Sequence, residues 1–350
     1  MKITRLFYIE DEVIYSFISS LLEKSSKSNE NEVYFWFSEL YYSGLKKKSI
    51  SLLQQVYYDY YFYHNSSFMT YMETKIYKSQ QEKSIVPLLH IISNLLKMNK
   101  NSKSFQLTYC IKNSKQPPKE DIPEKITIKI INTLIDYLND DKFLNFCSLL
   151  CQYQDSVKSI ESMLIKKYNI CYDKTISIIH KLSRIVAILV AFADNKIISK
   201  KRRFYYRATP QIVEFVFSVD KNCKHIDQRK FTIHKNMGCF LLNRQSEKFL
   251  KRFYMKWEYY AYQCPRWKRR MKNYIHSVDS KKKKINFNSD CDLEKFYEKF
   301  YIDLEDGPVE FINKSRFLME ENTFENWIYS YFPKNEKIVD FSVLPIIPLL

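Results

Sequence analysis

A shortage of glycine is the feature that most restricts the possible folds. The 350 residues include only 3 glycines, Gly44, Gly238 and Gly307, whereas average usage is about 7%. Phosphate-cradling loops and dinucleotide-binding fingerprints need several glycines close together, and β-sandwiches and propellers normally use glycine at many turns. The sequence therefore disfavours these architectures.

Apolar residues recur at helical spacing through much of the chain. Ile14, Phe17, Ile18, Leu21 and Leu22 form one apolar stripe, and the acidic pair 11–12 before it suits a helix N-terminus. Similar spacing predicts further helices at about 32–42, 49–64, 84–97, 124–139, 141–153, 155–169, 174–194 and 245–263. The most hydrophobic of them, 174–194, is expected at the centre of a core.

Polar and proline-containing segments are expected between these helices. Residues 24–32 read as a loop, 99–123 as a linker or long loop, and 281–284 as an exposed loop. Residues 204–219 fit either a strand pair or a helix that begins at Pro210, and 220–238 reads as irregular. Gly44 suits a helix end after residue 42. We therefore expect a mostly α fold, with an N-terminal helical bundle or helical-repeat domain, a basic and mainly helical domain, and minor β structure.

Charge is distributed unevenly along the chain. The net charge is +17, yet residues 195–288 alone carry +19 and residues 289–350 carry −7. Composition divides the chain into an N-terminal helical domain, central hydrophobic helices, a basic region and an acidic segment with an apolar tail, at 1–115, 124–194, 195–288 and 289–350. A local positive field attracts nucleic acid, an anionic membrane surface or an acidic protein. A Lys-rich solvated surface from an AT-rich genome is the alternative interpretation.

The sharpest basic element is 248–272, where cations alternate with tyrosine, phenylalanine and tryptophan. Cations neutralise phosphates, and exposed aromatic rings can stack on bases; at helical spacing the same rings can instead belong to a core. The runs 200–203 and 281–284 fit the same surface, a nuclear-import signal or solvated loops. The predicted nucleic-acid contacts are Lys200, Lys201, Arg202, Arg203, Lys251, Arg252, Lys256, Arg266, Lys268, Arg269, Arg270 and Lys272.

Residues suited to metal binding or catalysis form no recognised motif. Cys223, His225, His234 and Cys239 are the ligand types of a zinc site, but their spacing fits no common zinc finger, so four unrelated side chains are favoured. A carboxyl group at Glu39 or Asp59, both set among tyrosines, is a candidate acid or base with a raised pKa, although a hydrogen bond from a Tyr hydroxyl or a position in water explains each one more simply. We expect no enzymatic activity, no cofactor and no bound metal.

The cysteines and the apolar runs bear on the compartment. The 8 cysteines lack the spacing of a disulfide framework, so reduced thiols are expected. The longest apolar run is 185–193, much shorter than the roughly 20 residues that a membrane-spanning helix needs. No membrane span is therefore expected.

Two aromatic islands resemble known proteins. Residues 34–44 read YFWFSELYYSG and are followed by VYYDYY at 56–61, and residues 256–268 read KWEYYAYQCPRWK. They resemble a set of uncharacterised proteins encoded by large nucleocytoplasmic DNA viruses. The resemblance covers about 45 residues and implies a viral protein, located in the host cytoplasm, in the virion or in the host nucleus.

Two functional hypotheses follow. The first is a non-enzymatic nucleic-acid-binding protein of viral transcription, replication or genome packaging, contacting DNA or RNA phosphates through the basic residues above. The second is a virion assembly protein that acts by protein–protein contacts. We expect the acidic C-terminal segment either to dock on the basic region or to bind another viral protein.

Overall fold

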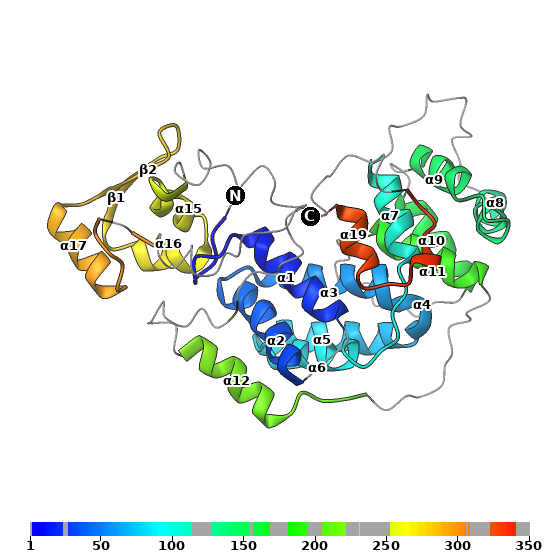
Figure 1. Cartoon of the computed structure of the whole chain (residues 1–350), viewed down its shortest axis with the longest axis horizontal. Helices are drawn as coiled ribbons and strands as arrows, with labels where there is room; N and C mark the ends of the chain where they lie inside the picture. The colour runs from blue at the N-terminus through cyan, green and yellow to red at the C-terminus, as the bar shows by residue number, and fades with distance from the viewer. Residues whose placement is uncertain are drawn as a thin grey trace. The chain divides into compact units, whose positions relative to one another are not determined.

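A computed structural model describes residues 2–23, 27–113, 128–153, 157–168, 181–194, 205–221, 231, 253–305, 307–308 and 323–340. These residues are mostly helical, with one small antiparallel sheet (Figure 1). The predicted fold class is therefore confirmed. The chain forms two compact units, Met1–Ser49 with Ala208–Thr323, and Ile50–Arg207 with Phe324–Leu350. Each unit thus joins segments that are distant in sequence, whereas composition suggested four consecutive segments.

The first unit combines the N-terminal helices with most of the basic region. Its elements are α1 (Glu10–Leu22), α2 (Lys27–Tyr42), the start of α3 (Lys46–Val56), α12 (Pro210–Lys221), α15 (Trp257–Tyr262), α16 (Pro265–Met271), β1 (Ile275–Asp279), β2 (Lys284–Phe287) and α17 (Asp290–Lys299). The main-chain N–H of Ile9 donates to the Glu12 carboxylate at 2.9 Å. This bond satisfies a donor at the start of α1, where acidic residues were expected.

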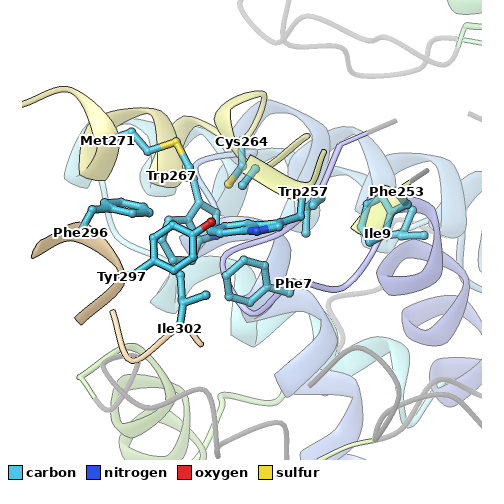
Figure 2. Close-up of a cluster of buried hydrophobic side chains, with 12 residues drawn as sticks. Phe7, Ile9, Phe253, Trp257, Cys264, Trp267, Met271, Phe296, Tyr297 and Ile302 are labelled. Carbon is cyan, nitrogen blue, oxygen red and sulfur yellow. The ribbon is translucent and has the colours of Figure 1, made fainter. Parts of the chain in front are cut away.

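Two tryptophans organise the core of the first unit (Figure 2). Trp257 of α15 and Trp267 of α16 enclose Phe7, whose ring centroid lies 5.5 and 4.9 Å from theirs. Phe296 of α17 packs edge-on against Trp267. Phe7 has φ of 63°, a costly conformation for an aromatic residue. Close packing on both sides retains this strained turn, so the N-terminal segment is part of the core formed by residues 253–302.

The two strands form a hairpin whose turn is made of lysines. Val278 pairs with Ile285, and Asp279 with Lys284. The Asp279 carboxylate accepts the main-chain N–H groups of Lys281 and Lys282, both at 2.9 Å. The expected exposed loop at 281–284 is thereby confirmed as a turn held by Asp279, with Lys284 opening β2.

The second unit is built around α11. Its elements are the rest of α3, the π-helix η1 (Tyr57–Tyr61), α4 (Phe62–Asn65), α5 (Phe68–Glu82), α6 (Val86–Leu95), α7 (Lys103–Asn113), α8 (Ile128–Asn139), α9 (Phe143–Gln152), α10 (Val157–Tyr168), α11 (Lys181–Ala193), α19 (Phe324–Tyr329) and the 3-10 turn η6 (Lys334–Glu336). Helices α4, α7, α8 and α10 contact α11 (Figure 1). Residues 185–190 of α11 are fully buried, which confirms the expected core helix 174–194 over its described part, since 174–180 lie outside the described residues.

Several local predictions need correction. The expected linker 99–123 contains α7, in which residues 104–111 are all buried although several of them are polar; residues 114–123 lie outside the described residues. Helix α5 went unpredicted, and α2 starts inside the expected loop 24–32. The expected helix 245–263 is interrupted by a turn at Met255 and Lys256, and its part before residue 253 lies outside the described residues. For residues 204–219, where a strand pair and a helix from Pro210 were both open, the structure has the helix, α12, which starts at Pro210.

The acidic segment divides between the two units. Its first helix, α17, packs on the basic region through Phe296 and Tyr297. The part from residue 324 to 340 instead packs in the second unit, where Trp327 and Ile328 are fully buried. Among the described residues, the expected docking on the basic region therefore holds for α17 and for Ile302 and Gly307, which follow it. The apolar tail 343–350 lies outside those residues.

Gln106 of α7 holds residues 329–339 in place by hydrogen bonds. Its side-chain oxygen accepts the Tyr329 hydroxyl at 3.0 Å and the N–H groups of Ile338 and Val339 at 2.9 and 3.2 Å. Its amide nitrogen donates to the Glu336 carbonyl at 2.8 Å. The Gln106 side-chain amide is fully buried. It thus makes the hydrogen bonds that a neighbouring strand would otherwise provide to the main chain of residues 336–339.

We expect Gln106→Ala to release residues 329–339. Loss of the acceptor leaves two main-chain donors and one hydroxyl unsatisfied, at a cost of about 2–4 kcal/mol. Amide hydrogen exchange at Ile338 and Val339 measures the effect. Gln80→Ala, at an exposed position on α5, is the control, and unchanged protection in Gln106→Ala would refute this role.

Candidate nucleic-acid interface

Half of the predicted phosphate-contacting residues lie in the described chain. Lys200, Lys201, Arg202, Arg203, Lys251 and Arg252 lie outside it. The described ones sit on or just beside the two short helices of the first unit, and they are Lys256, Arg266, Lys268, Arg269, Arg270 and Lys272. Their surroundings differ, so the structure separates them into those that share a groove and those that have other contacts.

The turn between α2 and α3 positions the start of α16. The Ser43 carbonyl accepts the Cys264 thiol and the Arg266 N–H, both at 3.2 Å. Gly44 follows with φ of +89°, and a Cβ there would lie 2.8 Å from the Pro265 Cβ. Glycine is required here for both reasons, which agrees with the predicted helix end and brings Lys46 beside α16.

A groove of about 750 Å³ opens along this junction. Its cationic lining residues are Lys46, Lys268, Arg269 and Lys272, all exposed, and no carboxylate lines it among the described residues. Gly44, Tyr262, Pro265 and Ile275 supply the uncharged surface. We call this feature the basic groove.

The four cations of the basic groove keep their charge available. In the described part of the chain none of them is paired with a carboxylate. The Lys268 ammonium lies 5.3 Å from the centre of the Tyr262 ring, a cation–π contact that holds it over the groove. Because concave walls of low polarity focus a field, like charges gathered here attract an anion more strongly than the same charges on a flat surface.

The other predicted cations have structural contacts. The Arg270 guanidinium covers the Trp267 ring at 4.6 Å and Phe300 at 5.1 Å. The Lys256 ammonium donates to the Lys282 carbonyl at 3.0 Å and so braces the hairpin turn. Neither residue lines the basic groove, and neither does Arg266, which is half-buried.

The aromatic residues between these cations divide in the same way. Phe253, Trp257 and Trp267 are buried in the core. For these three rings, packing in the core rather than stacking on bases is therefore the role that the structure shows. Tyr262 is half-buried and lines the groove. Among the described aromatic residues of 248–272, Tyr262 is the one that lines the groove beside its cations.

Lys46 is the groove cation that sequence reasoning missed. It opens a KKK run at 46–48, which is a visible signal of positive charge. Its relevance depends on contacts such as Ser43 with Cys264, which are 221 positions apart. Local periodicity carries no information about such distant partners.

The two carboxylates considered for catalysis are buried in different units. Glu39 accepts the Arg5 Nε at 2.8 Å and the Leu6 N–H at 3.0 Å, and both ionised side chains are fully buried. Asp59 lies in η1 of the second unit. Burial raises the pKa of Asp59 to about 6, while the Lys112 charge and the Ser183 and Gln55 side chains act in the opposite direction. Glu39 thus has a structural partner, an arginine rather than the expected tyrosine.

No metal-binding cluster of three or more His, Cys, Asp or Glu residues occurs within the described ranges. The candidate zinc ligands Cys223, His225, His234 and Cys239 lie outside those ranges. Cys147 and Cys151 are buried, and their thiols face the Leu107 and Ile111 carbonyls of α7 at 3.9 and 3.2 Å. Packing against α7 explains this pair.

Comparisons with protein-family models, with curated proteins and with solved structures gave no match. Among the described helices, none combines the length and apolar character needed to cross a bilayer. Interpretation therefore depends on the side chains themselves.

The raised pKa of Asp59 predicts a pH-dependent stability. The folded state retains the Asp59 proton up to about pH 6, whereas the unfolded chain releases it near pH 4. Wild-type stability therefore falls as pH rises from 4 to 6, by about 2–3 kcal/mol, and the penalty persists at higher pH.

Asp59→Asn removes this titration. Relative to wild type, we expect the variant to gain about 2–3 kcal/mol of stability between pH 4 and pH 7. Urea unfolding across this range measures the difference, with Asp136→Asn at an exposed site on α8 as control. A difference that does not vary with pH would contradict a neutral, buried Asp59.

Proposed function

We propose that this protein binds nucleic acid through the basic groove. The observation that carries the proposal is the convergence of Lys46, Lys268, Arg269 and Lys272 on one concave surface without a lining carboxylate among the described residues. A polyanion placed there meets several cations at once and releases its condensed counterions, which is the main source of sequence-independent affinity for nucleic acid.

The uneven charge of the chain supports the same proposal. The segment 195–288 has a net charge of +19, and three of the four groove cations come from it. The hairpin turn adds the exposed Lys281, Lys282 and Lys283 to the same unit. These charges extend the attractive field around the unit and favour fast, salt-sensitive association.

The resemblance of the two aromatic islands to proteins of large DNA viruses suggests a biological setting. In the first unit, residues 34–44 and 256–268 supply Gly44, Tyr262, Pro265 and Lys268 to the basic groove. We place the proposed activity in viral transcription, replication or genome packaging. A role in virion assembly through protein contacts remains the competing hypothesis.

Charge reversal in the groove tests the proposal. For Lys268→Glu with Arg269→Glu, we expect at least a tenfold loss of affinity for labelled oligonucleotides near physiological salt. The slope of log affinity against log salt should fall by about 1.4–1.8, because each lost phosphate contact removes about 0.7–0.9. Fluorescence anisotropy at several salt concentrations measures both quantities.

A matched variant separates groove binding from total charge. Lys129→Glu with Lys166→Glu makes the same change in net charge at exposed positions on α8 and α10 of the second unit. It should retain most of the affinity. Equal losses in the two variants, or no binding by the wild type at low salt, would reject the basic groove as the site, and the second of these outcomes would favour the assembly hypothesis.

A further inference from the structure

The basic groove has an uncharged floor that phosphate binding alone does not require. Half of its eight lining residues carry no charge, namely Gly44, Tyr262, Pro265 and Ile275. Phosphates of a duplex could be met by the cations with this floor left in water. A ligand that covers both kinds of surface needs an anionic group and a flat apolar group close together.

The floor is held rigidly enough to present a fixed surface. Tyr262 is the last residue of α15 and Pro265 the first of α16. Pro265 is held against Gly44 by a contact too close for any larger residue at position 44. Cys264, between the two helices, is buried, and its thiol donates a hydrogen bond to the Ser43 carbonyl. A ring that stacks on Tyr262 or Pro265 therefore binds to a preorganised surface, and these residues lose little conformational entropy on binding.

The arrangement of charge around this floor matches a nucleotide. Lys268 lies against the Tyr262 ring, while Arg269 and Lys272 line the groove from the same helix and the residue after it. The groove volume of about 750 Å³ falls within the range of small-molecule sites, roughly 300–1,000 Å³. An unpaired base with its flanking phosphates has the size and the mixed chemistry that this site can cover.

We propose that the basic groove binds single-stranded nucleic acid, with an unpaired base against Tyr262 and Pro265 and the backbone phosphates on Lys46, Lys268, Arg269 and Lys272. This inference rests on the proposed function and names the strand type that the site selects. Stacking on an aromatic ring tolerates any base, so the preference is for single strands rather than for a sequence.

The test compares probes with equal charge and different bases. Fluorescence anisotropy is measured with a labelled 15-mer of thymidine, an abasic 15-mer with the same number of phosphates, and a 15-base-pair duplex. The wild type should bind the thymidine strand at least five times more tightly than the abasic strand, and more tightly than the duplex. An abasic strand or a duplex that binds as well as the thymidine strand would overturn the inference and leave phosphate binding intact.

Variants of Tyr262 assign the preference to the groove. Tyr262→Ala should weaken thymidine binding by about 5- to 100-fold, the range of one lost base stack, and leave abasic binding within about twofold. Tyr262→Phe should retain the preference. Tyr259→Ala is the matched control, because Tyr259 is a half-buried neighbour on α15 that does not line the groove.

The outcomes distinguish the two proposals. Failure of every probe to bind would contradict the proposed function itself. Binding with an unchanged preference in Tyr262→Ala would overturn the inference alone. If Tyr262→Ala does not fold, the wild-type comparison of thymidine and abasic strands still decides, because it needs no substitution.

Discussion

The buried ion pair between Arg5 and Glu39 is the interaction on which the first unit depends. Both side chains are fully excluded from solvent, and the Arg5 N–H also donates to the Ser43 hydroxyl at 2.9 Å. Removing one partner would leave an uncompensated charge in the interior, at a cost of about 3–5 kcal/mol. The pair fixes the N-terminal segment to the end of α2. From this junction, Phe7 reaches the core around Trp257 and Trp267 (Figure 2). Ser43 holds the start of α16 by accepting the Arg266 N–H.

The basic groove follows from that junction. Its floor and its cations come from the turn after α2 and from residues 262–275. These segments meet through the direct contact of Ser43 with Cys264, and the N-terminal segment contacts both of them, through Arg5 with Glu39 and Thr4 with Trp267. Acidic residues are numerous in 289–350, yet none lines the groove in the described chain. Folding thus leaves a concave surface whose described lining carries four cations and no carboxylate. This arrangement is the physical basis of the proposed function.

The sequence predicted the helical class and several local features, because these depend on near neighbours. Gly44 ends α2, the lysines at 281–283 turn the hairpin, and 181–193 forms a core helix. Helix α7 was missed because its buried residues include Ser104, Gln106 and Thr108, and such polar residues are typical of a linker when their partners are unknown. The groove was only half predicted. Lys268, Arg269 and Lys272 stood out by charge, but Lys46 and the role of Tyr262 depend on contacts across more than half of the chain.

Photo-cross-linking tests the central claim most directly, since it reports which residues touch the nucleic acid. A single-stranded oligonucleotide carrying 5-bromouracil would be irradiated in complex with the whole protein, and the cross-linked peptides would be identified by mass spectrometry. The account predicts a cross-link at Tyr262, and its loss on adding unlabelled single strand in excess. Efficient cross-linking confined to other peptides, with Tyr262 unmodified, would contradict it.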